Sequence, residues 1–386
     1  MNVAFYAPLK VVDHPVPSGD REMARAFVTL LIGLGHDVRI ASRLRSFDRA
    51  GSRAFQQRVA ASAEMEIDRL GDSGSDGWRP DLWFTYHAYH KAPDLLGPAV
   101  ARKLCIPYVV AEASIAGKQA SGPWADGHRS TIDAVNAASA VLAMTDVDAR
   151  ELARYLDDRL CLHLFPPFLT SDSVKARDRN GTRRRFANQF GVSSDAVWLV
   201  TVAMMRSDVK RESYRLLAHS LAGLPRKDWR LLVVGSGEKA AEVRSELRAA
   251  AGENVFFLGE LPGAEVGAVL QACDVFVWPA LREAYGMAIL EALGAGLPVV
   301  ACDEGGVSDL VHNEHNGLLA PRRSPRELQQ RLERLIGDVK TRQRLGTRAA
   351  ELVSEVHSRR AAETRLAAIL AQVDRYHRSP VRSECS

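Results

Sequence analysis

The sequence predicts an α/β protein built from two successive doubly wound domains. Short apolar runs alternate with helical patterns along the chain, as in parallel α/β sheets. The series stops at a polar, arginine-rich stretch, SDSVKARDRNGTRRR, and then restarts. A length of 386 residues also exceeds what one hydrophobic core usually serves. We therefore expect an N-terminal domain at 1–170, a linker at 171–190, a second domain at 191–365, and a C-terminal helix and tail at 366–386.

In the first domain, apolar runs bounded by polar residues predict strands, and periodic stretches between them predict helices. Gly35 supplies a stop for the first helix. The predicted strands are 3–6, 38–41, 82–86, 108–111 and 141–144, and the predicted helices include 21–34 and 146–155.

The second domain repeats the pattern, with helical segments between its apolar runs. The predicted strands are 198–203, 231–234, 255–258, 275–277 and 298–301. After Arg322 the chain is predicted to be mostly helical to about His377, before a polar tail. Ligands of doubly wound sheets bind at the carboxyl ends of the strands, so we expect the site in the cleft between the domains.

Composition excludes several classes of protein. The chain is 46% hydrophobic and 25% charged, with a net charge of only +4, and no basic stripe alternates with aromatic residues. A nucleic-acid partner is therefore not expected. Five scattered cysteines without a CxxC pair indicate neither a disulfide framework nor a zinc site. No apolar run has the length of a membrane helix, and MNVAFYAPLK is too short for a signal peptide, so we expect a cytoplasmic protein.

A glycine-rich turn after the predicted strand 231–234 matches the dinucleotide pattern G-x-G-x-x-A. It reads Gly235-Ser236-Gly237-Glu238-Lys239-Ala240, and Glu260 follows where a dehydrogenase would place its ribose-binding acid. The turn follows the second strand of its domain, however, whereas that fingerprint belongs to a first strand. A dehydrogenase would also leave the first domain without a role. A tight turn beside a ligand cleft explains the same glycines.

Two glutamates flank a glycine at the start of an apolar helix in REAYGMAILEALGAGLPVVA. Gly286 stands between a loop at 280–285 and a helix predicted at 287–294, where unpaired N–H groups and the helix dipole favour an anion. Glu283 precedes this helix, and Glu291 lies one turn inside it. A ribose diol would donate two hydrogen bonds to Glu291. Alternatively, Glu283 pairs with a nearby arginine and Glu291 is simply exposed.

Two cations follow the first strand of the second domain. Arg206 and Lys210, in MMRSDVKRES, would point from the carboxyl end of that strand into the cleft. A lysine and an arginine that face a helix N-terminus form a cradle for a diphosphate. A solvated charged loop is the alternative.

These residues resemble a known family. REAYGMAILEALGAGLPVVACDEGG resembles the E-x7-E signature of the retaining glycosyltransferases of family 4. SGDREMARAFVTLLIGLGHDVRIAS is similar to that family's glycine loop, first helix and second strand, and VAMMRSDVKRESYRLLAHSL to its Arg/Lys loop. LLVVGSGE and VFFLGEL are similar to two of its turns. The motifs occur in the family's order over most of the chain, and they imply a GT-B fold, with two Rossmann-like domains facing across a cleft.

The resemblance also implies roles for the site residues. Glu291 would bind the ribose of a nucleoside diphosphate sugar, and Glu283 would lie beside the donor sugar. Arg206 and Lys210 would neutralise the leaving diphosphate. The other donor contacts would come from the amides of Gly286 and Met287 at the distal phosphate, from the turns near Gly237 and Leu261 beside the base, and from Gly19 in the glycine loop.

The sequence departs from the family pattern at three places. Arg206 stands four residues before Lys210, whereas the family's arginine usually stands five before its lysine. Arg211 replaces the glycine that usually follows that lysine, and Asp309 stands where the family's GG-x-x-E turn has its glutamate.

The family also places a histidine after a strand of the first domain. The segment DLWFTYHAYH offers His87 and His90. We assign His87 because it immediately follows the predicted strand. A structural role near a strand end is the alternative for this histidine.

Asp146-Val147-Asp148 has the D-x-D spacing of a metal site in a different glycosyltransferase fold. Because it follows Thr145 at a predicted helix start, we interpret it as part of a helix cap. Arg206, Lys210 and the helix dipole supply positive charge, so no metal is expected, and the nucleotide sugar would act as a co-substrate.

The segment 39–58 holds six arginines and one acid, Asp48. It would suit a weak peripheral contact with anionic lipid at the inner face of the membrane, or a polyanionic acceptor. A solvated helix face is the alternative.

Taken together, the residues and the resemblance predict a retaining hexosyltransferase that needs no metal. The acceptor would be a hydroxyl group on a glycan, a lipid-linked molecule or a small molecule. Two alternatives stay open: a nucleotide-sugar epimerase on the same fold, and a non-catalytic sugar-nucleotide-binding protein. The intact set of Arg206, Lys210, Glu283 and Glu291 argues against the second, because binding alone would tolerate the loss of one member.

Overall fold

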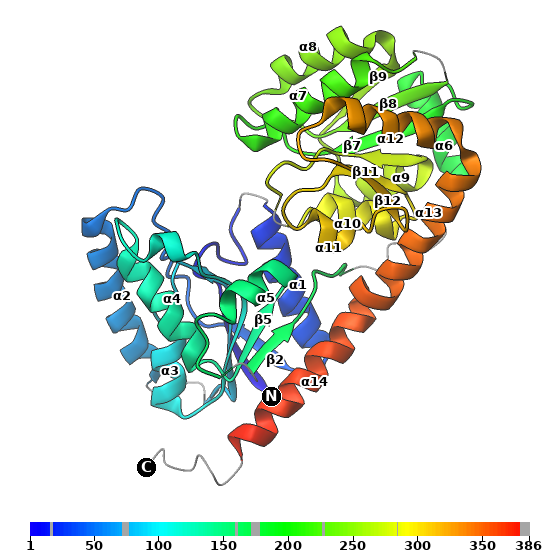
Figure 1. Ribbon diagram of the computed structural model, residues 1–386. Coiled ribbons are helices and arrows are strands. Elements are labelled where there is room, and N and C mark those ends of the chain that lie inside the picture. The colour runs from blue at the N-terminus through cyan, green and yellow to red at the C-terminus, as the bar shows by residue number, and fades with distance from the viewer. Residues whose placement is uncertain are drawn as a thin grey trace. The chain divides into compact units, whose positions relative to one another are not determined.

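The computed structural model describes residues 1–15, 18–71, 77–158, 161–170, 178–225, 228–283 and 285–378. The chain divides into two compact units. Unit 1 comprises Met1–Thr170 and Arg359–Ser386, and unit 2 comprises Ser171–Ser358. Each unit is built on its own parallel sheet with helices packed against it (Figure 1). The prediction of two doubly wound α/β domains is therefore confirmed.

Unit 1 has a six-stranded sheet over its described residues, in the order β2-β1-β3-β4-β5-β6. The strands are β1 (Asn2–Tyr6), β2 (Asp37–Ile40), β3 (Leu82–Tyr89), β4 (Tyr108–Ser114), β5 (Ala140–Ala143) and β6 (Leu162–Leu164). The helices are α1 (Gly19–Gly33), α2 (Arg53–Gly71), α3 (Gly97–Leu104), the short η1 (Gly117–Gln119), α4 (Ala125–Ala137), α5 (Asp146–Leu152) and α14 (Arg359–His377). The predicted strands are all present, whereas β6 and helices α2 to α4 were not predicted.

Strand β3 shows why the sheet of unit 1 is covered on both faces. Successive residues point to opposite faces of a strand, and both Trp83 and Phe84 are buried. Phe84 lies 5.5 Å from the ring of Phe27 on α1, while Trp83 packs at 6.1 Å from Tyr6 on the other face. Helices α2, α3 and α4 pack in succession, and α1 packs with α14 (Figure 1).

Helix α14 belongs to unit 1, which corrects the predicted boundaries at 365 and 366. The helix begins at Arg359 and contacts α1. Near its end, Nε2 of His377 lies 3.0 Å from the carbonyl oxygen of Cys105. Its buried residues are Ala362, Leu366, Ile369, Leu370 and Val373. This spacing forms one apolar stripe, but a stripe does not reveal which domain covers it.

Unit 2 has a second six-stranded sheet within the described ranges, in the order β12-β11-β10-β7-β8-β9. The strands are β7 (Val197–Val202), β8 (Trp229–Val234), β9 (Val255–Gly259), β10 (Val275–Val277), β11 (Val299–Cys302) and β12 (Gly317–Ala320). The helices are α6 (Arg179–Phe190), α7 (Val209–Ala222), α8 (Ala240–Ala251), α9 (Gly263–Ala272), α10 (Met287–Gly294), α11 (Val307–Leu310), α12 (Pro325–Gly337) and α13 (Val339–Leu352), with short turns η3 (Gly252–Asn254) and η4 (Val353–His357).

Strand order locates the ligand crevice of unit 2. The chain adds β8 and β9 on one side of β7, and then places β10 on the other side. β7 and β10 are neighbours, with Phe276 opposite Val200. Doubly wound sheets bind ligands at the carboxyl ends of the strands where the order reverses. The loops after β7 and β10 are therefore the expected ligand loops.

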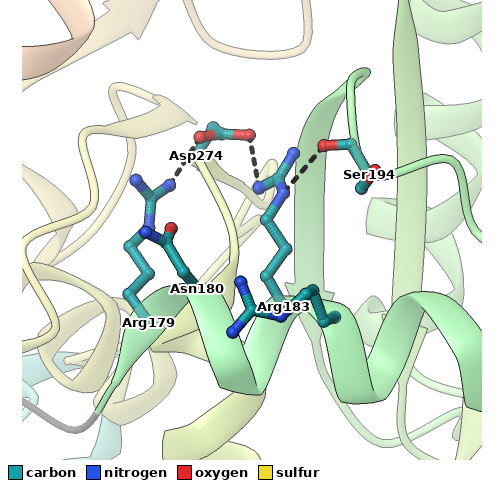
Figure 2. Close-up of a pocket in the computed structure, with 6 residues that line it drawn as sticks. Arg179, Asn180, Arg183, Ser194 and Asp274 are labelled. Carbon is teal, nitrogen blue, oxygen red and sulfur yellow. Dashed lines mark hydrogen bonds and ion pairs between the residues drawn. The ribbon is translucent and has the colours of Figure 1, made fainter.

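Residues 179–190 form helix α6, which corrects the predicted linker at 171–190; residues 171–177 lie outside the described residues. The side chain of Asp178 caps α6 by accepting a hydrogen bond from the Gly181 amide at 2.9 Å. Arg179 and Arg183 then bind the two oxygens of Asp274 at 2.6 and 3.0 Å (Figure 2). These ion pairs hold α6 against the rest of unit 2.

A pocket of about 320 Å³ lies beside α6, and it contains none of the predicted site residues. It is lined by Arg179, Asn180, Arg183, Arg184, Ser194 and Asp274 (Figure 2). Arg183 also donates to the backbone oxygens of Ser194 at 3.0 Å and Ala272 at 2.8 Å. Its guanidinium is therefore already engaged in docking α6, and we assign this pocket a structural role.

The arginines of 39–58 do not form one helix face. Arg43 pairs with Asp13 at 2.7 Å before α2 begins, whereas Arg53 and Arg58 belong to α2. In the part of the chain that the structure describes, no helix is both long enough and apolar enough to span a bilayer.

Candidate active site

The loops after β7 and β10 bring together two of the predicted site residues. Lys210 lies in the first turn of α7, where the side chain of Asp208 accepts a hydrogen bond from its amide at 2.9 Å. The Lys210 ammonium forms an ion pair with the carboxylate of Glu283, in the loop after β10. Both side chains are 22% exposed, so the pair is partly shielded from solvent yet reachable. The partner of Glu283 is thus a lysine rather than an arginine.

Trp278 forms a wall of this site, and it was not predicted. It immediately follows β10 and is 2% exposed. The Lys210 ammonium lies 5.7 Å from the centroid of the Trp278 ring, within cation–π range. On its other side, Trp278 packs edge-on against Tyr214 of α7 at 4.8 Å. A single tryptophan at the carboxyl end of a short apolar strand was the signal available in the sequence.

The backbone of Glu283 is held by the Gly305-Gly306 turn after β11. The Gly306 amide donates to the Glu283 carbonyl oxygen at 3.2 Å. A Cβ at Gly305, where φ is +64°, would stand 2.4 Å from that same oxygen. Ala280 and Arg282 in the Glu283 loop also have positive φ, 56° and 50°. Such backbone costs about 1–3 kcal/mol per residue and concentrates at functional sites.

Gly286 immediately precedes helix α10, as predicted. Its φ of +73° turns the chain from the loop into the helix, and its carbonyl accepts from the Ile289 amide at 2.7 Å. A Cβ there would lie 2.9 Å from Cδ1 of Ile289. Met287 is the first helical residue. The first amides of an α-helix have no acceptor within the helix, so this end presents donors to an anion.

Glu291 lies in the second turn of α10. Its side chain reaches solvent. Burial of its carboxyl by the surrounding protein nevertheless raises the pKa to about 7. One side of the Glu291 side chain faces solvent, so a ligand can reach the carboxyl. Protein atoms pack around its other sides, and this packing raises the pKa. Among the described residues, none forms an ion pair with Glu291, so its hydrogen-bonding capacity is open to a ligand.

Arg206 lies in the loop after β7 and is exposed. Its guanidinium contacts Sδ of Met204 at 3.0 Å. Ser207 donates to Glu238 from its side chain and, at 2.9 Å, from its amide, and these hydrogen bonds, with the charges of Lys239 and Arg206, lower the pKa of Glu238. No contact recorded among the described residues joins Arg206 to the Lys210–Glu283 pair.

Gly235 and Gly237 allow the Arg206 loop to cross the turn after β8. A Cβ at Gly235 would lie 2.1 Å from the Ala203 oxygen, and one at Gly237 would lie 2.4 Å from the Met205 oxygen. Two backbone hydrogen bonds of 2.9 Å also join Met205 to this turn. The glycine pattern therefore serves loop packing, and β8 does not lie at the reversal of strand order where a dinucleotide would bind.

Leu261 and Gly19, which were also predicted to contact the nucleotide sugar, lie outside the loops after β7 and β10. Leu261 is half-buried in the loop after β9. Gly19 is the first residue of α1 in unit 1, and a Cβ there would meet nothing within 4 Å. Space alone therefore does not require glycine at position 19.

In unit 1, His87 lies within β3, two residues before its end, rather than after the strand as predicted, and it stands beside two acids. Its Nδ1 is 3.2 Å from Oδ1 of Asp20, in the first turn of α1, and 3.4 Å from Oε1 of Glu112, in β4. Burial alone would lower the pKa of His87, but the charge of Glu112 and the close contact and charge of Asp20 raise it above the usual value. Asp20 and Glu112 were not predicted; the signal was a lone acid inside the apolar strand YVVAEAS.

Asp146-Val147-Asp148 begins helix α5, as predicted. The Thr145 hydroxyl oxygen accepts from the Asp148 amide at 3.0 Å, and the hydroxyl donates to the Asp148 carboxylate at 2.6 Å. Over the described ranges, no group of three or more His, Cys, Asp or Glu side chains is placed to hold a metal ion. A metal-free reaction stays a prediction.

The segment around this site resembles known proteins. Residues 200–352 match the family model of the glycosyl transferases, group 1. Within this segment lie Arg206, the Lys210–Glu283 pair, the start of α10 and Glu291. The glycosyl transferase match thus covers the part of unit 2 in which the ligand loops lie.

Curated relatives of the chain include two enzymes from Streptomyces. A D-inositol 3-phosphate glycosyltransferase of Streptomyces bingchenggensis (strain BCW-1) is 26% identical over 292 residues, which are 70% of this chain and 63% of the relative. A 2-deoxystreptamine glucosyltransferase of Streptomyces kanamyceticus is 35% identical over 113 residues, 29% of each chain. The chain therefore spans less than two thirds of the length of these relatives.

Solved structures share the fold. Sucrose-phosphate synthase from Thermosynechococcus elongatus has a TM-score of 0.74 at 17% identity, over 97% of this chain and 99% of that one. HepE from Anabaena, in complex with UDP and glucose, has a TM-score of 0.70 at 17% identity, over 96% of this chain and all of that one. These likenesses confirm the predicted GT-B class of fold.

Proposed function

We propose that this protein is a retaining glycosyltransferase that moves a hexose from a nucleoside diphosphate sugar to a hydroxyl acceptor without a metal ion. The observation that carries the proposal is the Lys210–Glu283 ion pair at the reversal of strand order in unit 2. It lies in the segment that matches the glycosyl transferase family model. The structure of HepE in complex with UDP and glucose further supports a nucleotide-sugar donor.

In this proposal, the charge that develops on the leaving diphosphate is stabilised by Lys210, Arg206 and the amides of Gly286 and Met287. Preorganised donors of this kind usually contribute more to catalysis than any other single effect. An ammonium group has three N–H donors, so Lys210 can keep Glu283 as a partner and also bind a phosphate oxygen. The ion pair would then hold the Lys210 side chain in position before the donor arrives.

The other residues would fix the donor and the acceptor. Glu291 would accept hydrogen bonds from the ribose, and Glu283 would orient the donor sugar. The turns at Gly237 and Leu261 would border the base. On unit 1, Gly19 and His87 would contact the transferred sugar or the acceptor, whose type we leave open between a glycan, a lipid-linked molecule and a small molecule.

A thermal-shift panel of nucleotide sugars tests the proposal, with UDP-glucose and GDP-mannose as the first probes. A ligand at about 100 times its dissociation constant should add about 2.7 kcal/mol of stability. The shift should persist in EDTA and, at pH 8, shrink in Glu291→Gln, while Arg184→Ala on helix α6 serves as the control. If no nucleotide sugar stabilises the wild-type protein, the proposed donor class is wrong.

Product analysis separates transfer from the two alternative functions. A transferase should release the nucleoside diphosphate only when an acceptor is present, and NMR of the new linkage should show the anomeric configuration of the donor. An epimerase would convert the sugar without an acceptor. A binding protein would show the thermal shift and no product with any acceptor.

A further inference from the structure

Strands β3 and β4 of unit 1 depart from regular geometry at the same level of the sheet. Tyr86 pairs with Ala111, and the strands resume their register two residues later, so His87 and Glu112 lie opposite each other. Both have positive φ, 61° and 56°. Neither is a glycine, and left-handed backbone at such residues is uncommon. Strained backbone at two facing residues does not help the strands to pair, and such strain concentrates at functional sites.

Glu112 is the acid of this pair, and its surroundings give it a specific partner. It is 9% exposed, in a strand that is otherwise apolar. Its Oε1 lies 3.4 Å from Nδ1 of His87, within ion-pair distance but without hydrogen-bond geometry, and its Oε2 is buried without a hydrogen-bond partner in the described structure. Tyr86 also stabilises the ionised form of this carboxyl, whose pKa it lowers. A buried carboxylate needs compensation, and the nearby imidazolium supplies it.

We propose that Glu112 is a positioning residue for His87: together with Asp20, it fixes the Nδ1 side of the ring and keeps the ring charged, which leaves Nε2–H as the donor to a hydroxyl of the transferred sugar or the acceptor. The identity of that ligand rests on the proposed function. The pairing of Glu112 with His87 does not, because it is a property of unit 1 alone.

The other groups around His87 have smaller and mixed effects on its charge. Asp148 on α5 adds a further negative charge, and Lys10 offsets part of the charge of Asp20. The Tyr89 ring lies 5.3 Å from the His87 ring, and burial raises the pKa of Tyr89 to about 12, so this phenol stays neutral near pH 7. Glu112 is the leading source of charge that favours the imidazolium, so it is the residue to test.

The pair is charged only within a window of pH. The carboxylates raise the pKa of His87, so the interaction is present below that pKa and is lost as pH rises through it. Burial raises the pKa of Glu112 as well, so the pair is also lost at low pH, when Glu112 takes up a proton. Transfer should therefore decline on the alkaline side as His87 loses its proton.

NMR titration of the histidine side chains tests this pairing directly in the 386-residue chain. His87 should titrate above the value of about 6.5 for free histidine. Glu112→Gln should move its midpoint down, whereas Glu151→Gln, which removes an exposed acid paired with Arg154, should not. A wild-type midpoint at or below that of free histidine would overturn the proposal, as would an unchanged midpoint in Glu112→Gln.

Activity and donor binding separate this proposal from the proposed function. With UDP-glucose as donor, Glu112→Gln should shift the alkaline limb of the kcat profile to lower pH and leave the affinity for UDP, which lacks the sugar, within about twofold of wild type. If the wild-type protein binds no nucleotide sugar, the proposed function fails while the titration still decides the pairing. If Glu112→Gln does not fold, Glu112→Asp, which keeps the charge one methylene farther away, should give a smaller downward shift. The wild-type titration decides alone if neither variant folds.

Discussion

Nucleotide-sugar binding should depend on pH through Glu291. Its carboxylate accepts two hydrogen bonds from a ribose diol only when it is ionised, and burial raises its pKa to about 7. Such a group is about one-tenth ionised at pH 6 and about nine-tenths ionised at pH 8, so affinity should rise about tenfold between these values. UDP-glucose is a suitable probe because its phosphates are diesters whose charge is constant over this range.

Isothermal titration calorimetry of wild type and Glu291→Gln at pH 6, 7 and 8 measures this effect. The variant should lose about 1.5–3 kcal/mol of binding free energy at pH 8, the usual contribution of hydrogen bonds to a charged group. It should also lose the dependence on pH. A variant that keeps the full tenfold dependence, or a wild-type protein with none, would refute the assignment of Glu291 to the ribose.

The same carboxyl affects stability with a defined sign. A raised folded-state pKa means that Glu291 favours the folded state most below its unfolded value of 4.5, and that this contribution is lost as pH rises through about 7. Glu291→Gln should therefore raise the melting temperature relative to wild type more at pH 8 than at pH 5. Because the side chain reaches solvent, screening makes the effect small, and its sign is the quantity to test.

Three other predictions concern the cation, the metal and helix α6. Lys210→Ala should lower kcat far more than it weakens UDP-glucose binding, because charge develops on the leaving phosphate; an unchanged kcat with a raised KM would contradict this role. Activity should survive EDTA, and Asp148→Asn should keep turnover within a few-fold of wild type; rescue of a lost activity by magnesium would contradict a metal-free reaction. Arg183→Ala should cost about 1.5–3 kcal/mol of unfolding free energy by denaturant titration, because Asp274 loses one charged partner but keeps Arg179.

The donor side of the site could be predicted largely because its information is local in sequence. Gly286 and Glu291 belong to one loop and one helix, and α10 has the bounds that were predicted for it. The contact between Lys210 and Glu283 depends on the adjacency of β7 and β10, which strand order implies. Trp278 was missed because an apolar residue after a strand is more often part of the core.

The parts that could not be predicted depend on long-range packing. Glu112 lies in an apolar run, and its sequence does not reveal the register in which β3 and β4 pair. That register places His87 opposite Glu112. Helix α6 has one buried residue, Phe186, among polar ones, so its composition resembles a linker. Its docking depends on Asp274, which lies far along the chain and precedes a strand.

The membership of α14 in unit 1 has a consequence for synthesis on the ribosome. Unit 2 is continuous in the chain, whereas unit 1 lacks its last helix until Arg359–His377 has been made. At about 5–20 residues per second, the first 170 residues wait about 10–40 s for this helix. During that interval, the surface of α1 that α14 covers is exposed to chaperones and to other nascent chains. A chain that ends before α14 would expose this surface permanently. The first domain to begin folding is thus the last to be completed.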